Sequence, residues 1–187
     1  MSAACRETRP IVSNIDQAWS MDFVSDGLFN GRRIRALTIV DNYSRECLAR
    51  HVDHSISADK VVGVMQELKR FTGRVPDRIQ LDNGAEFISR ALDKWAYENR
   101  VVLDFSRPGK PTDNAYIESL YGGFRGECLN THWLLSLVDT REKIETWMRD
   151  YNGFRPHSAL DNMTPEEYVK MHSKTSEISN LPGTAFG

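Results

Sequence analysis

Three acidic side chains stand at positions where a carboxylate is chemically informative. Asp22 lies inside a short apolar run, 19–24, where a charge is costly unless it is paired. Asp82 follows a segment rich in β-formers, at the kind of strand end where α/β folds place functional groups. Glu118 lies on an expected helix. If the three carboxylates converge, their repulsion calls for a cation, and a set of oxygen ligands suits Mg²⁺ or Mn²⁺.

Such a triad has a well-defined chemistry. Two divalent ions about 4 Å apart activate an attacking oxygen and stabilise a leaving oxygen in phosphoryl transfer. Taken singly, each acid has an ordinary alternative. Asp22 fits a salt-bridged strand residue, Asp82 fits the tight turn of Asp82-Asn83-Gly84, and Glu118 fits a solvated helix residue. Only their joint arrangement indicates catalysis.

The elements that position these acids follow from the apolar periodicity. The front third has three β-rich segments, with the hairpin signal Asn30-Gly31 between the first two, and predicts an antiparallel meander. The later segments alternate between helical and strand periods. We expect strands over 19–24, 35–40, 47–52, 78–81 and 101–105. We expect helices over 57–71, 87–97, 113–129, 140–151 and 165–172.

This order predicts an α/β fold. Antiparallel hairpins followed by β-α-β units imply a mixed sheet with helices on both faces. Glu118 falls on the third of the expected helices, for which Thr112 or Asp113 is the expected N-cap. On that helix Asn114, Glu118 and Tyr121 share one face, because residues three and four apart are neighbours.

The chain of 187 residues has the length of one domain. We expect a flexible arm over 1–15, a core over 16–172 and a disordered tail over 173–187. No stretch approaches the roughly 20 apolar residues of a membrane helix, and the start has no secretory h-region. The three cysteines are far apart and form no C-x-x-C motif. These features favour a reducing, cytoplasmic setting without a zinc site or a disulfide framework.

The charge balance argues against a simple nucleic-acid binder. The net charge is -2, whereas a module built only to hold DNA is usually basic. Basic residues do gather around 32–35, 69–78 and 100–110, although solvated faces are the ordinary explanation of such groups. His51 and His54 have the spacing of a metal pair but are better explained as strand-end residues.

Beyond the three acids, a series of motifs resembles the catalytic core of DDE transposases and retroviral-type integrases. The resemblance is strongest to the second reading-frame product of bacterial insertion-sequence transposases. The motifs are WSMDF at 19–23, TIVDNYSR at 38–45, DNGAEF at 82–87, SRPGKPTDNA at 106–115, IES at 117–119, ECLN at 127–130, YN at 151–152 and RPHSAL at 155–160. They cover roughly 19–168, and 35 residues separate Asp82 from Glu118.

The resemblance implies a ribonuclease H-like fold, whose sheet has three antiparallel strands and then two strands parallel to the first. It implies that Asp22 ligates two Mg²⁺ or Mn²⁺ ions when DNA is bound, and that Asp82 and Glu118 each complete one metal site. The implied reaction is cleavage at the end of a DNA element, followed by attack of the new 3′-hydroxyl on another phosphodiester. DNA is then the partner, at element ends and target, and coordinated cleavage of two ends requires a homodimer or a higher oligomer.

Four residues are candidates for DNA contacts. Arg107 and Lys110 lie in the loop before the third helix, where they are expected to hold phosphates. Asn114 either orients Glu118 or touches DNA, and a helix-surface role is about equally expected. Arg125, two turns beyond Glu118, is expected to contact the DNA backbone.

The chain also departs from the family pattern. Relatives usually carry a basic residue near position 123 and a charged residue at 126, where this chain has Gly123 and Gly126. With Gly122 the helix holds three glycines, each costing about 1 kcal/mol relative to alanine. This predicts a helix that ends early or moves. Arg155 and His157 either reach back to the site or have a structural role.

A second departure lies at the front, where relatives carry an N-terminal helical DNA-binding region that is absent from this chain. We therefore expect weak recognition of specific element ends. Three alternative functions stay open. The first is a catalytically inactive remnant that only binds nucleic acid or partner subunits. The second is a ribonuclease H-type or junction nuclease of the same fold, and the third is a binding module with no metal dependence.

Overall fold

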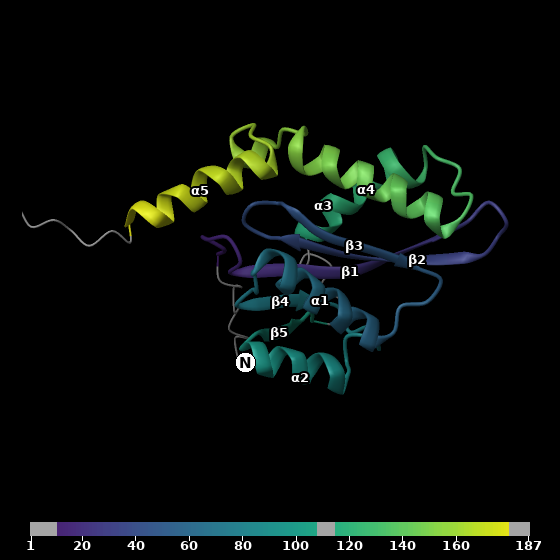
Figure 1. Ribbon diagram of the computed structural model, residues 1–187, viewed down its shortest axis with the longest axis horizontal. Coiled ribbons are helices and arrows are strands. Elements are labelled where there is room, and N and C mark those ends of the chain that lie inside the picture. The colour runs from purple at the N-terminus through teal and green to yellow at the C-terminus, as the bar shows by residue number, and fades with distance from the viewer. Residues whose placement is uncertain (1–10, 108–114, 180–187) are drawn as a thin grey trace, which may run out of the picture.

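The computed structural model describes residues 11–107 and 115–179 (Figure 1). The strands are β1 Ala18–Gly27, β2 Arg33–Asp41, β3 Cys47–Asp53, β4 Arg78–Leu81 and β5 Val102–Phe105. The helices are α1 Ala58–Thr72, α2 Arg90–Asn99, α3 Ala115–Phe124, α4 Leu137–Gly153 and α5 Pro165–Ser179, with a π-helical turn over Arg125–Leu129 and a 3₁₀ turn over Ser158–Leu160. No helix within the described residues is long and apolar enough to cross a membrane.

The strands form one sheet in the order β3-β2-β1-β4-β5. β1 pairs antiparallel with β2, and β2 pairs antiparallel with β3. β4 runs parallel to β1, and β5 runs parallel to β4. The structure therefore confirms the predicted mixed sheet, with three antiparallel strands followed by two strands parallel to the first.

Helices cover both faces of the sheet, and each face has its own apolar core. One core joins strand residues to side chains of α1 and α2, and the other joins strand residues to side chains of α3 and α4. Figure 1 shows α2 and α4 on opposite sides of the sheet. Along β1, Trp19 and Met21 belong to the α1–α2 core, whereas Val24 belongs to the α3–α4 core. Because strand side chains alternate between faces, Asp22 lies on the α3 side.

Capping side chains set the helix boundaries. Ser57 caps α1 and Gly73 ends it with φ 71°, as the periodicity predicts. α2 begins after the capping residue Ser89, later than expected, and Phe87 fills the α1–α2 core instead. α4 begins earlier than expected because Ser136 caps it.

The helix that carries the third acid does not end early at its glycines. α3 holds Gly122 and Gly123 and continues directly into the π-helical turn, which holds Gly126. That turn closes with a hydrogen bond from the backbone N–H of Asn130 to the carbonyl oxygen of Arg125, at 2.8 Å. The expected run to about residue 129 is confirmed, with a wider last turn in place of a break.

α5 extends beyond the helix expected over 165–172 and ends at Ser179. The first part of the segment expected to be a disordered tail is therefore helical. Residues 180–187 lie outside the described residues, as do 1–10 and 108–114. The last of these segments holds Lys110, Asn114 and both expected cap residues of α3. The division into arm, core and tail otherwise stays a prediction.

Candidate active site

Parallel pairing of β1 with β4 brings two of the three acids together. The register pairs Ser20 with Gln80, and Asp22 and Asp82 each follow two residues later. Ser20 Oγ donates a hydrogen bond to Gln80 Oε1 at 3.2 Å, which joins the two strands just before the acids. The negative charge of Asp82 raises the pKa of Asp22, as a like charge in the neighbourhood of a carboxylate does.

Asp22 sits in a half-buried environment that disfavours its charge. Burial is the main cause that raises the pKa of Asp22 above its ordinary value, and the charge of Asp82 adds to the effect. The backbone N–H of Phe23 donates to Asp22 Oδ1 at 2.7 Å and lowers the pKa. The side-chain hydrogen bond from Tyr121 and the charge of Arg35 lower it further, but they do not cancel the rise. A bound cation would balance the remaining negative charge.

The turn expected over Asp82-Asn83-Gly84 is present, and it holds Asp82 in place. Asp82 Oδ1 accepts a hydrogen bond from the backbone N–H of Gly84 at 2.9 Å. Asn83 Nδ2 donates to the carbonyl oxygen of Ser106 at 2.9 Å, which ties the turn to the segment after β5. A Cβ at position 84 would lie 2.9 Å from Asp82 Oδ1, so this arrangement requires glycine there. The turn therefore fixes the orientation of the candidate acid Asp82.

A charged and aromatic cluster behind the two acids has no counterpart among the predicted site residues. Arg35 forms an ion pair with Glu86, and its guanidinium lies 4.1 Å from the centre of the Phe23 ring. Phe23 stacks on Phe87 with ring centroids 4.9 Å apart. This cluster anchors the segment after Asp82 to the sheet. The DNGAEF motif contains Glu86 and Phe87, but the distant arginine partner leaves no local signal.

α3 reaches the acids through Tyr121. Its hydroxyl lies 3.3 Å from Thr38 Oγ1 and hydrogen-bonds the Asp22 carboxylate, while Thr38 Oγ1 donates to the backbone carbonyl of Asp22 at 3.1 Å. Glu118, one turn earlier on α3, is exposed. Across 11–107 and 115–179, no three His, Cys, Asp or Glu side chains lie close enough to hold one metal ion. The structure thus joins Asp22 to Asp82 and leaves Glu118 outside the pair.

The Asp22–Asp82 pair fits a hard divalent cation. Both ligand groups are carboxylates, and oxygen ligands suit Mg²⁺ and Mn²⁺. Burial first, and then the nearby charge of Asp82, disfavours the negative charge on Asp22 and raises its pKa. Arg35 offsets that charge only in part, and its guanidinium also forms an ion pair with Glu86. A third carboxylate from Glu118 joins such an ion only if its side chain or its helix turn takes another position.

The four candidates for DNA contacts are only partly described. Arg107 is exposed directly after β5. Arg125 is exposed, and its Nη2 donates to the carbonyl oxygen of Ser25 at 3.3 Å, near the end of β1. Lys110 and Asn114 lie outside the described residues. The DNA contacts of all four candidates stay predictions.

Arg155 has a structural partner on the π-helical turn. It forms a bidentate ion pair with Glu127, and Trp147 Nε1 donates to the same carboxylate at 3.1 Å. A Cβ at position 123 would lie 2.8 Å from Arg155 Nη1, so Gly123 leaves the space that the guanidinium occupies. His157 packs its ring edge-to-face on Tyr151. Of the two roles considered for Arg155 and His157, these contacts favour the structural one.

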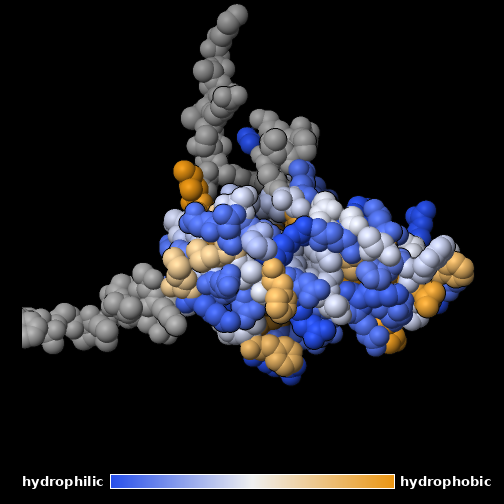
Figure 2. Space-filling view, turned by 90° about the horizontal axis from the view of Figure 1, so that it is seen from above, coloured by the Kyte–Doolittle hydropathy of each residue, from blue (hydrophilic) through white to orange (hydrophobic). Residues whose placement is uncertain are grey.

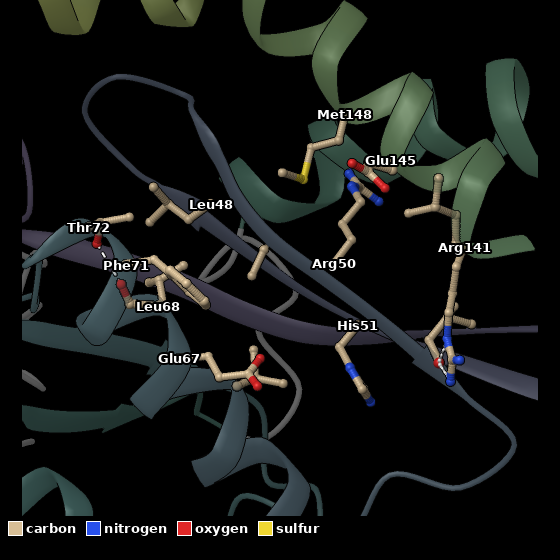
Figure 3. A pocket seen from close by; sticks show the side chains of 14 residues that line it. Leu48, Arg50, His51, Glu67, Leu68, Phe71, Thr72, Arg141, Glu145 and Met148 are labelled. Carbon is tan, nitrogen blue, oxygen red and sulfur yellow. Dashed lines mark hydrogen bonds between the residues drawn. The ribbon is translucent and has the colours of Figure 1, made fainter. Parts of the chain in front are cut away.

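A cavity of about 690 Å³ lies apart from the acids, between β3, α1 and α4 (Figure 3). Figure 3 shows the Arg50 side chain extending toward α4 near Met148, while His51 points to the other side of β3. None of the three predicted catalytic acids lines this cavity. His54 Nδ1 lies 2.8 Å from the carbonyl oxygen of Arg33, which fits the strand-end role expected for it.

Comparison with known proteins identifies the family. The integrase core domain model matches residues 14–111, and a second integrase core domain model matches residues 99–165. The chain is 46% identical over 172 residues to the insertion element IS407 uncharacterized 31.7 kDa protein of Burkholderia multivorans, covering 92% of this chain and 62% of the relative. It is 43% identical over 165 residues to the insertion element IS476 uncharacterized 39.2 kDa protein of Xanthomonas euvesicatoria, covering 88% and 47%. The chain thus spans only part of these relatives.

Solved structures show the same fold. The catalytic core domain of HTLV-2 integrase in complex with magnesium superposes with a TM-score of 0.66 at 14% identity, over 82% of this chain and 95% of that chain. A chain of the simian T-cell lymphotropic virus intasome in complex with PP2A regulatory subunit B56 gamma gives a TM-score of 0.71 at 14% identity, over 91% and 56%. The fold is therefore that of a ribonuclease H-like integrase core.

The chain belongs to the integrase core domain family. Within it, the sequence relatives are proteins of bacterial insertion elements, which confirms the resemblance to a DDE transposase or integrase core.

Proposed function

We propose that this chain is the catalytic core of a transposase, which cleaves DNA and joins the new end to another site with divalent metal ions as cofactors. The observation that carries the proposal is the Asp22–Asp82 pair. The half-buried carboxylate of Asp22 on β1 and the exposed carboxylate of Asp82, just after the parallel strand β4, lie close enough for the charge of Asp82 to raise the pKa of Asp22. Membership of the integrase core family and the insertion-element relatives support the same function.

The side chains divide the work in this proposal. Asp22 and Asp82 would hold one metal ion, and Asp22 and Glu118 would hold a second. When bound, such ions polarise the phosphodiester and activate the attacking oxygen. Tyr121 and the backbone N–H of Phe23 keep the Asp22 carboxylate oriented. Water and then a DNA 3′-hydroxyl act as nucleophiles, so no covalent intermediate with the protein is required.

Glu118 enters the site by a short movement in this proposal. It lies one helical turn, about 5.4 Å along the axis, from Tyr121, whose hydroxyl already contacts Asp22. Glu118 is also in the first turn of α3, where the helix has the fewest backbone hydrogen bonds. A change of side-chain rotamer and of that turn is therefore the least costly way to complete the metal site.

DNA is the proposed partner, both at element ends and at the target. Phosphate contacts from Arg107, Lys110, Asn114 and Arg125 would position it. Coordinated cleavage of two ends requires a homodimer or a higher oligomer. A protein that acts on bacterial DNA works in the cytoplasm.

A specific observation favours a second candidate, the inactive remnant. Glu118 is exposed and joins no three-ligand cluster within the part of the chain that the structure describes. A core that cannot bring Glu118 to the Asp22–Asp82 pair would bind metal and DNA without cutting. The two candidates therefore differ in turnover rather than in fold.

The test is nicking of a supercoiled plasmid in Mn²⁺, which needs no knowledge of the element ends. We compare the wild type with Asp82→Asn and with the matched control Asp77→Asn. Asp77 is an exposed acid just before the first residue of β4, whereas Asp82 follows its last residue. Nicking by the wild type and the control, but not by Asp82→Asn, supports the proposal. Absence of nicking by the wild type favours the remnant, and cleavage of RNA–DNA hybrids without joining favours a ribonuclease H-type nuclease.

A further inference from the structure

Two aromatic rings stand exposed together at one end of the molecule. Phe29 lies in the hairpin between β1 and β2 and is 67% exposed, and Trp133 lies in the loop before α4 and is 71% exposed. Their ring centroids are 5.1 Å apart and the rings meet edge to face at 75°. Neither ring fills the core, so the fold itself does not explain the pair.

The backbone beneath the rings is fixed in place. The backbone N–H of Phe29 donates to the carbonyl oxygen of Leu134 at 2.8 Å, and Leu134 is buried in the α3–α4 core. Lys143 Nζ donates to the carbonyl oxygen of Trp133 at 2.6 Å. Two segments far apart in sequence thus present the rings in one arrangement. A rigid aromatic surface loses little conformational entropy when a flat partner stacks on it.

The charges around the pair favour an anionic partner. Arg32 and Arg33 are exposed on the same hairpin, and Arg125 is exposed beside the end of β1. The nearby Asp139 accepts from Lys143 at 2.7 Å and from the backbone N–H of Leu135 at 2.9 Å, so its charge is offset within the protein.

Other acids nearby have partners of their own. Glu127 is paired with Arg155, and Asp26 accepts a hydrogen bond from the backbone N–H of Gly27. Arg32, Arg33 and Arg125 thus place three exposed cationic side chains on the β1–β2 side of the rings, whereas the exposed acids Glu142 and Asp150 lie on α4. Aromatic side chains among arginines are typical of surfaces that bind single-stranded nucleic acid.

The pair is also in line with the proposed active site. β1 runs from Asp22 to Gly27, five residues of strand that span about 17 Å, and then enters the hairpin. At about 3.4 Å per nucleotide, that length corresponds to roughly five nucleotides of DNA. We propose that Phe29 and Trp133 form a stacking platform for unpaired bases of the DNA substrate, at this distance from the scissile phosphate. The proposal rests on the proposed function and adds a binding surface to it.

Apolar neighbours make a second copy of the chain the competing occupant. Leu135 is 60% and Val138 is 63% exposed, close in sequence to Trp133. Figure 2 shows apolar side chains among hydrophilic ones at the end of the molecule that carries the β1–β2 hairpin. The arginines favour DNA over a second copy, because like-charged arginines from two copies would repel each other.

The test measures binding of a fluorescein-labelled thymidine oligonucleotide to the full chain by fluorescence anisotropy, in EDTA, so that no cleavage occurs. We compare the wild type with Trp133→Ala, Phe29→Ala and the matched control Tyr97→Ala, an exposed aromatic residue on α2. We expect Kd to rise about fivefold or more for Trp133→Ala and Phe29→Ala, which matches the loss of one stacked base, and to be unchanged for the control. The dependence of Kd on salt should stay the same in Trp133→Ala and weaken in the double variant of Arg32→Ala with Arg33→Ala.

Equal Kd values for the wild type and Trp133→Ala would overturn the platform. A wild-type dimer that dissociates in Trp133→Ala with unchanged oligonucleotide affinity would assign the surface to a second copy instead. Binding in EDTA is independent of the plasmid-nicking result. If Trp133→Ala binds more weakly but the wild type does not nick the plasmid, the platform is supported and the catalytic proposal is rejected. If the wild type nicks the plasmid but Trp133→Ala binds as tightly as the wild type, the catalytic proposal is supported and the platform is rejected.

Discussion

The hydroxyl of Tyr121 on α3 hydrogen-bonds the carboxylate of Asp22 on β1, with Thr38 bridging to the backbone of the same residue. The bond connects the helix that carries Glu118 to the strand that carries the first acid of the proposed site. Burial and the nearby Asp22 charge raise the pKa of Tyr121 well above its ordinary value, so the hydroxyl keeps its proton and acts as a donor. The position of α3 and the orientation of Asp22 are therefore coupled.

Removal of the Asp22 charge tests the shared metal site. The pKa of Asp22 is raised in the folded state, so ionisation of this group reduces the free energy of unfolding as pH rises above the ordinary value of 3.8. We expect Asp22→Asn to melt at or above the wild-type temperature at pH 7 without metal, and this difference to shrink as the pH falls toward 4. Mn²⁺ should stabilise the wild type, by about 2.7 kcal/mol at one hundred times Kd, and the variant only slightly.

Differential scanning calorimetry with and without Mn²⁺ makes this measurement, with Asp77→Asn as the control. Equal metal-dependent shifts in melting temperature for the wild type and Asp22→Asn would reject Asp22 as a ligand. A variant that melts well below the wild type at pH 7 would contradict the charge argument.

The Tyr121 hydroxyl is expected to tune the metal site rather than the fold. Tyr121→Phe keeps the ring in the α3–α4 core but removes the donor to Asp22. Groups that orient a metal ligand are typically worth 10–100-fold in metal affinity or activity. We expect the apparent Mn²⁺ Kd to rise about tenfold, with little change in melting temperature. Titration calorimetry checks this, with the exposed Tyr97→Phe as the matched control, and an unchanged Kd would reject the role.

The mixed sheet and the two acids were predictable from local patterns in the sequence, whereas the strand arrangement that brings Asp22 near Asp82 was implied by the family resemblance. A charge inside the apolar run of β1 marks Asp22, and the turn signal after β4 marks Asp82. The Arg35–Glu86 ion pair was not predictable, because 51 residues separate its partners and only the fold brings them together. The position of Glu118 was not predictable either, because it depends on the contacts that Tyr121 makes one helical turn later with residues of the sheet.

The glycines of α3 show a different limit of sequence reasoning. Helix propensity counts each glycine as destabilising, yet α3 continues through Gly122 and Gly123. Gly123 provides space for Arg155 Nη1, which binds Glu127 on the π-helical turn. The contact is made by a residue more than thirty positions away. Helix propensity alone therefore predicts an early helix end at Gly123 and misses the space that this glycine provides.

These two adjacent glycines form a matched pair for a stability test. Gly122→Ala meets no heavy atom within 4 Å and should raise the free energy of unfolding by roughly 0.5–1 kcal/mol. Gly123→Ala places its Cβ 2.8 Å from Arg155 Nη1, so the gain in helix propensity should be cancelled or reversed. In an Arg155→Ala background, Gly123→Ala should again raise the free energy of unfolding. Urea unfolding of the wild type, the two single variants at 123 and 155 and their double variant checks this cycle. Identical effects of Gly123→Ala in both backgrounds would contradict it.

The last prediction separates the position of Asp82 from the stability of its turn. In Gly84→Ala the new Cβ would lie 2.9 Å from Asp82 Oδ1 and 3.4 Å from Glu86 Oε2, so the carboxylate of Asp82 must move. The turn lies at the surface, and Asp82 and Gly84 are not part of either apolar core. We therefore expect a change in unfolding free energy of at most about 1 kcal/mol, as is usual for residues outside the core, but a loss of plasmid nicking of tenfold or more.

Gly63→Ala on α1 is the control, because its added Cβ meets no heavy atom within 4 Å. It should leave nicking unchanged and raise the melting temperature slightly, because alanine has the higher helix propensity. Nicking at the wild-type rate by Gly84→Ala would mean that the observed position of Asp82 is not the one used in the reaction. A large loss of stability in Gly84→Ala would instead assign the turn a role in holding the fold, since the displaced carboxylate would then disturb the packing of Phe87 against Phe23.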